Sequence, residues 1–409
     1  MKAGFSRRTI TPDRLMTLAG FDRRTAPAAG ALEDLFVSVL ALEDDSGRRF
    51  LLCSFDLLGT DRALCCRVRE ALSAAVPPQR IWVCATHTHS APRGAFSGGV
   101  SEDSAYLSHI VNACKAAAEA ALAGLVPVSA LWGEGAVPGV ASLRDVPREQ
   151  ADFSMPLRVL RLQADGFTLP IVRFACHPTV LSEDNLLYSR DLPGGCEAGS
   201  TLWLNGPCAD LSTRFTRRES SPREVRRMGD LIKAGLASME MMPAPDFGRS
   251  IRVWEETLDL PYGSTLRGEA RQALLRQLLE QAEACADSAA RREVDSCIAV
   301  LQREEQDLPH SRRVTVAACD LGSHLLLALS FEVSWQDGLS LEREAAAISG
   351  KPALLVCYCG GYDGYLPQNT AGISYQNLAT GYLPQAREQI RQALRACAEN
   401  TQHERRSAT

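Results

Sequence analysis

Residues 80–92, RIWVCATHTHSAP, join a short apolar run to two histidines that one threonine separates. The isoleucine, tryptophan and valine of the run are typical of a buried strand. Because side chains alternate along a strand, His87 and His89 project to the same side at its end. Two imidazoles on one face can both bind one metal ion, or one can bind it while the other transfers protons. Two histidines that are hydrogen-bonded in a polar loop are the alternative.

Apolar runs of this kind recur along the chain and define the fold class. Each is bounded by Gly, Pro or Asp, as expected of strands. They lie at 35–43, 49–59, 80–86, 156–163, 169–177, 201–206, 251–260, 313–332 and 353–362. Helical patterns fall between some of them, at 61–76, 103–124, 222–240 and 376–399. This order predicts an α/β or α+β protein whose mixed β-sheet core is flanked by helices.

One segment departs from this alternation. Residues 265–307 are rich in Leu, Ala, Glu and Arg, contain no proline, and space their apolar residues as a helix does. They predict a helical hairpin or one long helix, packed on the outside of the sheet as scaffold. We interpret residues 1–400 as a single domain that carries this helical insertion, and residues 401–409 as a polar tail.

The overall composition limits the partners and the compartment. The chain has 409 residues and a formal net charge of −5, which gives no electrostatic reason to expect nucleic acid. No stretch approaches the roughly 20 apolar residues of a membrane span, so we expect no stable membrane insertion. The first 15 residues lack the apolar core of a signal peptide. Many of the 14 cysteines lie inside apolar runs, and we therefore predict a reduced, cytoplasmic protein.

Two more strand ends carry residues that could share a site with the histidine pair. His177 follows an apolar run, and Pro178 then ends ladder bonding, which repeats the arrangement at His87. Glu332 interrupts the apolar stretch LLLALSFEVSW (325–335). A buried carboxylate needs a cation or a set of hydrogen bonds. A shared metal ion would supply that cation; a structural role for His177 and an arginine partner for Glu332 are the alternatives.

Together these segments resemble, in order along the chain, motifs of the neutral ceramidases and their shorter bacterial relatives. ATHTHSAP (85–92) is similar to the family's THTHSGP signature, and FACHPTVL (174–181) to its FAxHPT segment. The other matches are YSRDLPGG (188–195), NGPCADLS (205–212), SFEVS (330–334) and GGYDGYLP (360–367). The resemblance implies a ceramidase-like catalytic domain. We expect a short, bacterial-type member without the C-terminal immunoglobulin-like domain of full-length ceramidases.

The resemblance also implies a zinc ion held by two histidines, a glutamate and a tyrosine. Tyr362 is an alternative to the tyrosine we prefer, and His89 would transfer protons or position the substrate. Arg144 would hold a carboxylate or carbonyl oxygen of the substrate. Ser212 would be either the nucleophile or, as we favour, a substrate contact. The implied ligands are His87, His177, Glu332 and Tyr365, of which Tyr365 could instead donate a hydrogen bond to the developing oxyanion.

A catalytic zinc ion lowers the pKa of its bound water to about 7 and so generates hydroxide at neutral pH. We therefore predict a zinc-dependent amidohydrolase that uses zinc-bound hydroxide to cleave an N-acyl bond in a small metabolite or an N-acylated lipid. Asp56 and Asp191 could orient the ligand histidines by hydrogen bonds to the ring nitrogens that do not bind the metal, although Asp56 could equally be a turn residue. The alternatives are a metal-dependent phosphoesterase, with these aspartates and Asp210 as extra ligands, an esterase, or a non-catalytic ligand-binding member of the fold.

Overall fold

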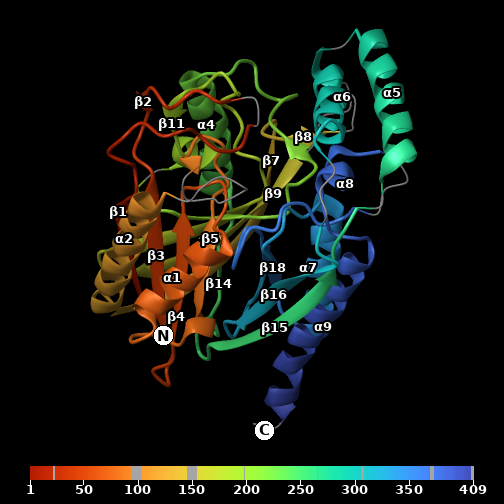
Figure 1. Ribbon diagram of the computed structural model, residues 1–409. Helices are drawn as coiled ribbons and strands as arrows, with labels where there is room; N and C mark the ends of the chain where they lie inside the picture. The colour runs from red at the N-terminus through yellow and green to blue at the C-terminus, as the bar shows by residue number, and fades with distance from the viewer. Residues whose placement is uncertain are drawn as a thin grey trace.

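Three β-sheets of four or five strands form the core of the protein (Figure 1). The computed structural model describes residues 1–21, 24–93, 103–144, 154–197, 199–264, 266–286, 288–304, 308–368 and 373–406. Helices cover the outer face of each sheet, and each sheet mixes antiparallel with parallel pairs. The predicted α/β class with a mixed sheet core and flanking helices is confirmed.

The N-terminal sheet has the strand order β5-β4-β3-β1-β6. Its pairs are antiparallel except for β4 and β5, which run parallel. Helices α1 (Arg62–Leu72) and α2 (Ser104–Ala123) pack on its outer face. The strands are β1 (Lys2–Thr9), β3 (Phe36–Glu43), β4 (Arg49–Phe55), β5 (Ile81–Ala85) and β6 (Val126–Pro127).

The central sheet has the order β12-β10-β9-β7-β14, and its one parallel pair is β10 with β12. Helix α4 (Pro222–Ser238) packs against β7 and β9, and the short helix α3 (Leu192–Cys196) packs on α4. The strands are β7 (Ser129–Pro138), β9 (Ser154–Ala164), β10 (Phe167–Phe174), β12 (Leu202–Asn205) and β14 (Met242–Pro243).

The C-terminal sheet has the order β15-β16-β17-β18, with β17 and β18 parallel. Helices α7 (Trp335–Ser349) and α9 (Gln385–Arg406) cover its outer face. Because α9 continues to Arg406, most of the predicted polar tail is helical, and residues 407–409 lie outside the described part of the chain. The strands are β15 (Arg252–Pro261), β16 (Ser311–Asp320), β17 (Leu325–Ala328) and β18 (Ala353–Val356).

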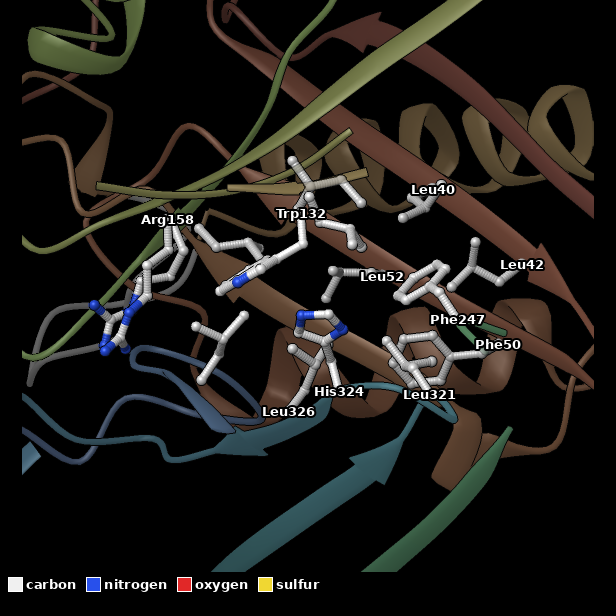
Figure 2. A pocket seen from close by; sticks show the side chains of 15 residues that line it. Leu40, Leu42, Phe50, Leu52, Trp132, Arg158, Phe247, Leu321, His324 and Leu326 are labelled. Carbon is white, nitrogen blue, oxygen red and sulfur yellow. The ribbon is translucent and has the colours of Figure 1, made fainter. Parts of the chain in front are cut away.

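The inner faces of the three sheets meet in one apolar cluster. Leu40 and Trp82 of the N-terminal sheet, Ile171 of the central sheet, and Leu326 and Leu354 of the C-terminal sheet all belong to it. Alternate residues of the same strands face outward onto the helices, so most strands are buried on both faces. A cavity of about 30 Å³ remains at the centre (Figure 2). The candidate ligands lie elsewhere, beyond the ends of the strands.

The predicted helical insertion is a hairpin of α5 (Gly268–Ala284) and α6 (Ser288–Leu301). We expected it to pack on the outside of the sheet. It packs instead through a small apolar cluster of its own on α8 (Tyr375–Ala379), beside the sheets (Figure 1). The remaining short elements are β2 (Gly30–Ala31) paired with β11 (Leu187–Tyr188), β8 (Ser142–Leu143) paired with β13 (Leu211–Ser212), and the 3-10 helix η1 (Pro78–Arg80).

Candidate metal centre and active-site pocket

Each of the three large sheets contains one parallel strand pair, and the carboxyl ends of these pairs lie close together. The N–H of Cys357, after β18, donates to the carbonyl of Asn205 at the end of β12, with 3.0 Å between nitrogen and oxygen. The N–H of Ala85, at the end of β5, donates to the carbonyl of Tyr358 at 3.1 Å. Backbone hydrogen bonds therefore tie the exits of all three sheets together, and side chains that follow these strands meet although they are far apart in sequence.

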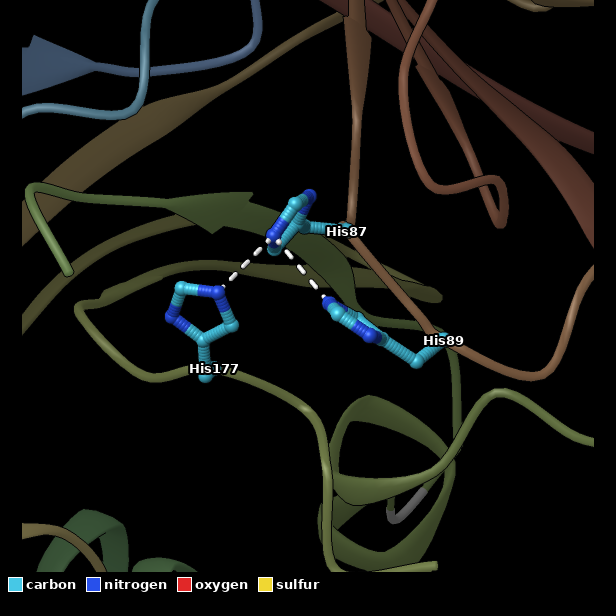
Figure 3. Close-up of side chains that lie close together, drawn as sticks. All are labelled: His87, His89 and His177. Carbon is cyan, nitrogen blue, oxygen red and sulfur yellow. Dashed lines mark hydrogen bonds between the residues drawn. The ribbon is translucent and has the colours of Figure 1, made fainter. Parts of the chain in front are cut away.

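His87, His177 and Glu332 follow β5, β10 and β17, one from each sheet, and their side chains lie together. The Nε2 atoms of His87 and His177 are 3.2 Å apart. Glu332 Oε2 lies 3.3 Å from His177 Nε2 and 3.6 Å from His87 Nε2. His89 Nε2 lies 3.4 Å from His87 Nε2, so the three histidines form one cluster (Figure 3).

Backbone carbonyls fix the orientation of two of these rings. His87 Nδ1 lies 2.7 Å from the oxygen of Leu58, and His177 Nδ1 lies 2.8 Å from the oxygen of Cys208. Because a carbonyl oxygen only accepts hydrogen bonds, each Nδ1 carries the hydrogen and each Nε2 presents a lone pair. Leu58 follows β4 and Cys208 follows β12, so the β4–β5 pair and the β10–β12 pair each supply one histidine and the carbonyl that holds it. Burial lowers the pKa of His87 to about 4, which keeps the ring neutral at pH 7.

The carboxylate of Glu332 is held from one side only. Its Oε1 accepts a hydrogen bond from the Tyr362 hydroxyl at 2.5 Å, whereas no donor in the described part of the chain satisfies the buried Oε2. Burial alone would raise the pKa of Glu332, but His87, His177 and Tyr362 lower it to about 2. An ionised oxygen that is buried without a partner is costly unless a cation lies beside it.

The donor atoms fit a single divalent metal ion. Two neutral imidazole lone pairs and a carboxylate oxygen are donors that zinc accepts, and ligand atoms around a tetrahedral zinc ion are about 3.3 Å apart. The observed separations of 3.2, 3.3 and 3.6 Å match that spacing. A set of His87, His89 and His177 is a second possible donor group, since their nitrogens lie within 4.8 Å of one another. The geometry therefore supports a metal site without identifying the metal.

The other predicted site residues surround the same place. The backbone of Tyr365 pairs with that of Glu332, and its side chain contacts Arg144. Arg144 Nη2 lies 3.3 Å from His177 Nε2, and Arg144 Nε donates to the carbonyl of Leu211 at 3.3 Å. Ser212, the next residue, lines the same pocket as these groups. The two candidate tyrosines thus differ: Tyr362 contacts the Glu332 carboxylate, and Tyr365 faces the pocket.

The two aspartates that we expected behind the histidines contact other groups. Asp56 Oδ2 lies 2.9 Å from Arg190 Nε and accepts the N–H of Phe36 at 2.9 Å. Asp191 accepts the N–H groups of Val180 and Leu181 at 3.2 and 2.9 Å. The prediction that they orient the histidines is therefore corrected, because carbonyls after the adjacent parallel strands already occupy both Nδ1 positions.

Tyr358 is a part of the site that the sequence did not indicate. Its ring stacks on that of His87, with centroids 4.0 Å apart and planes inclined by 14°. Its hydroxyl lies 3.1 Å from Cys208 Sγ, next to the carbonyl that holds His177. Both His87 and Tyr358 have positive φ angles, of 67° and 56°. Such backbone strain in non-glycine residues is concentrated at functional sites, where the surrounding structure enforces it.

An open pocket of about 240 Å³ adjoins the histidines. His89, His177, Arg144 and Tyr365 line it near the strand ends, and α6 also lines it with residues that include Arg292. The hairpin that we interpreted as scaffold therefore forms a wall of the candidate active site. Its sequence shows only an amphipathic pattern, which does not distinguish these two roles.

The fold and the site together define an α/β protein with a candidate metal centre, and its fold is similar to that of solved ceramidase structures. The structure of neutral ceramidase from Pseudomonas aeruginosa has a TM-score of 0.78 and 18% sequence identity to this chain, and covers 98% of this chain and 74% of its own. A ceramidase complexed with C2 has a TM-score of 0.76 and 17% identity, with coverages of 98% and 75%. The predicted resemblance is thus confirmed for the fold.

Other comparisons add little to this assignment. No protein-family model and no curated protein matches the sequence. Within the described residues, no helix has both the length and the apolar character that crossing a membrane requires.

Proposed function

We propose that the protein is a zinc-dependent hydrolase that cleaves the amide bond of an N-acyl compound. The observation that carries this proposal is the pair of Nε2 lone pairs facing each other at 3.2 Å beside the unpartnered Glu332 Oε2. His87, His177 and Glu332 would hold the ion, with Tyr365 as the fourth protein donor. When bound, zinc acidifies a coordinated water molecule and polarises a carbonyl oxygen, which suits amide hydrolysis.

His89 is the residue best suited to move protons. It lines the pocket, and its Nδ1 is buried without a hydrogen-bond partner among the described residues. Burial, reinforced by the neighbouring histidines and arginines, lowers the pKa of His89 well below its usual value. A neutral imidazole can take a proton from the attacking water and deliver it to the departing nitrogen. The C–N bond then breaks, and the products are a carboxylic acid and an amine.

Arg144 and Ser212 would bind the substrate. The buried guanidinium of Arg144 is a fixed donor for a carbonyl or carboxylate oxygen. Ser212 Oγ accepts the N–H of Arg214 at 3.1 Å, and no histidine or carboxylate of the described chain lies within hydrogen-bonding distance of it. A serine nucleophile needs an adjacent base. We therefore assign Ser212 a substrate contact rather than a covalent role.

A two-metal phosphoesterase has less support. Its extra ligands would be aspartates, but Asp56 and Asp191 bind an arginine and backbone N–H groups. Asp210 Oδ1 accepts the N–H of Trp335 at 2.7 Å. These carboxylates therefore hold the backbone together and are not gathered around a second ion.

The test combines metal content with turnover. We expect close to one zinc per chain by mass spectrometry, and hydrolysis of at least one member of a panel of N-acyl compounds. His87→Ala and His177→Ala should lose both the metal and the activity, whereas His109→Ala, an exposed histidine on α2, should change neither. Two metals per chain would favour the phosphoesterase. A zinc-loaded protein that cleaves nothing in the panel would favour a ligand-binding role.

A further inference from the structure

We propose that the pocket selects amides that carry an anionic group, a carboxylate or a phosphate, away from the scissile bond. This inference rests on the proposed hydrolase function and names its substrate class. The anion site is the arginine wall, which we define as Arg214, Arg217 and Arg292. Two of these residues follow β13, and the third lies on α6, so two segments that are distant in the sequence supply the wall.

The guanidinium groups of the arginine wall line one pocket, where their like charges repel one another. Burial is the main cause of the lowered pKa of Arg214, and the charges of Arg144, Arg292 and Arg217 contribute to it. Arg217 is affected in the same way, by burial and by Arg292. Like charges gathered at one pocket are relieved by an anion between them, and guanidinium groups bind carboxylate and phosphate oxygens in a planar fork.

Contacts with the rest of the protein hold two residues of the arginine wall in place, and N–H donors of the wall remain for a ligand. Arg217 Nη1 donates to the carbonyl oxygens of Thr179 and Val180, at 2.5 and 3.1 Å. Arg214 Nη1 lies 3.5 Å from Glu293. The exposed Arg292 side chain makes no hydrogen bond or ion pair with other described residues. The two anchored guanidinium groups are the pre-organised part of the anion site, and the exposed Arg292 can turn toward a bound anion.

The charge and polarity of the whole pocket agree with this assignment. Its described lining has five arginines against three carboxylates, and one of those carboxylates is already paired with Arg214. Phe21 and Ala299 are the aliphatic or phenyl side chains in the described lining, which is otherwise polar, tyrosyl or glycine. A long acyl chain would need an extensive apolar surface. A compact, charged amide fits these surroundings better.

The positions of the groups also set the orientation of the substrate. His89, His177 and Tyr365 line the pocket where the three sheets meet, and the arginine wall lines it toward α6. The scissile carbonyl would lie at the histidines and the anionic group at the wall. Hydrolysis adds one water across the C–N bond, and the anionic group is unchanged in the product that carries it.

Three matched amides test this proposal on the zinc-loaded protein. N-acetylethanolamine is neutral, its O-phosphate carries a phosphate, and N-acetylglycine carries a carboxylate. We expect kcat/KM for one or both anionic amides to exceed that of the neutral amide by tenfold or more. Which anion is preferred separates the phosphate from the carboxylate. Equal or faster turnover of the neutral amide would overturn the proposal.

A matched pair of variants on α6 locates the anion site. Arg292→Ala should raise KM for the preferred anionic amide about tenfold, as expected for a lost charged hydrogen bond, and leave the neutral amide unchanged. Arg291→Ala removes an adjacent arginine that lies 3.8 Å from Asp295 and does not line the pocket. It should change neither. Equal effects of the two substitutions would overturn the assignment to Arg292.

Calorimetric binding separates this inference from the proposed function. The three amides and inorganic phosphate are titrated into the zinc-loaded wild type and both variants. If no amide is cleaved but the anionic ones bind, and bind about tenfold more weakly to Arg292→Ala, the anion site stands and the hydrolase assignment fails. If the neutral amide is cleaved and no anion binds, the hydrolase assignment stands and the anion site fails.

Discussion

Tyr362→Phe removes the hydroxyl that holds the Glu332 carboxylate and leaves the ring in place. The hydroxyl donates to Oε1 at 2.5 Å, and no donor of the described chain satisfies Oε2. A hydrogen bond to a charged group contributes about 1.5–3 kcal/mol. Loss of a group that hydrogen-bonds to a metal ligand typically weakens metal binding 10–100-fold. We therefore expect the Kd for zinc to rise by about 10–100-fold, or about 1.4–2.8 kcal/mol.

Competition with a chromogenic chelator measures this change. Tyr106→Phe is the matched control, because Tyr106 is buried on α2 and its hydroxyl donates to the carbonyl of Ile10 at 2.8 Å, away from the candidate ligands. Its zinc affinity should equal that of the wild type. An unchanged zinc Kd in a folded Tyr362→Phe protein would refute the support of Glu332 by Tyr362. Loss of zinc as complete as in His177→Ala would make Tyr362 itself a ligand in place of Tyr365.

Three other substitutions test separate parts of the structure. His89→Ala should retain zinc and lose about 10²–10⁴-fold in kcat, the usual contribution of a proton-transfer group; loss of zinc would instead make His89 a ligand. Ser212→Ala should keep kcat within about tenfold, and inactivity with zinc bound would restore the serine nucleophile. Burial and the charge of Lys351 lower the pKa of His324 from 6.5 to about 4. As the pH falls the unfolded chain therefore takes up this proton first, so about 3 kcal/mol of unfolding free energy should be lost between pH 6.5 and 4. Urea unfolding of His324→Leu should lack this loss, and an equal loss in both proteins would contradict the assignment.

The strands could be predicted because most of them are buried on both faces. A strand between an apolar interior and a helix layer is a continuous apolar run, and β3, β4, β9 and β10 all fall on such runs. β1 and β7 were missed, since KAGFSRRT carries three cationic residues and SALWGEGAVP carries two glycines.

The helices, too, were predicted only in part. The predicted helix 376–399 is two helices, α8 and α9, because Gly381 and Pro384 lie between them. Helix α7 was missed, although its N-cap gave a signal: Ser334 accepts the N–H of Asp337, and both residue types favour a helix start.

For the site, the sequence predicted which residues lie at strand ends, but not that these strand ends meet. The position of His87, His177 and Glu332 after apolar runs could be read directly from the sequence. Their convergence depends on the ends of three separate sheets meeting, which no local pattern encodes. For the same reason the carbonyls that hold the histidines and the stacking of Tyr358 could not be foreseen.

The division of the donors among three sheets has a consequence for unfolding. No two of His87, His177 and Glu332 leave the same sheet, so opening any one sheet dismantles the donor set. An ion that binds only the intact arrangement raises its stability by RT ln(1 + [L]/Kd), about 4 kcal/mol at a thousandfold excess over Kd. Adding zinc should therefore slow proteolytic cleavage in all three sheets together. Protection confined to one sheet would show that residues of that sheet alone hold the ion.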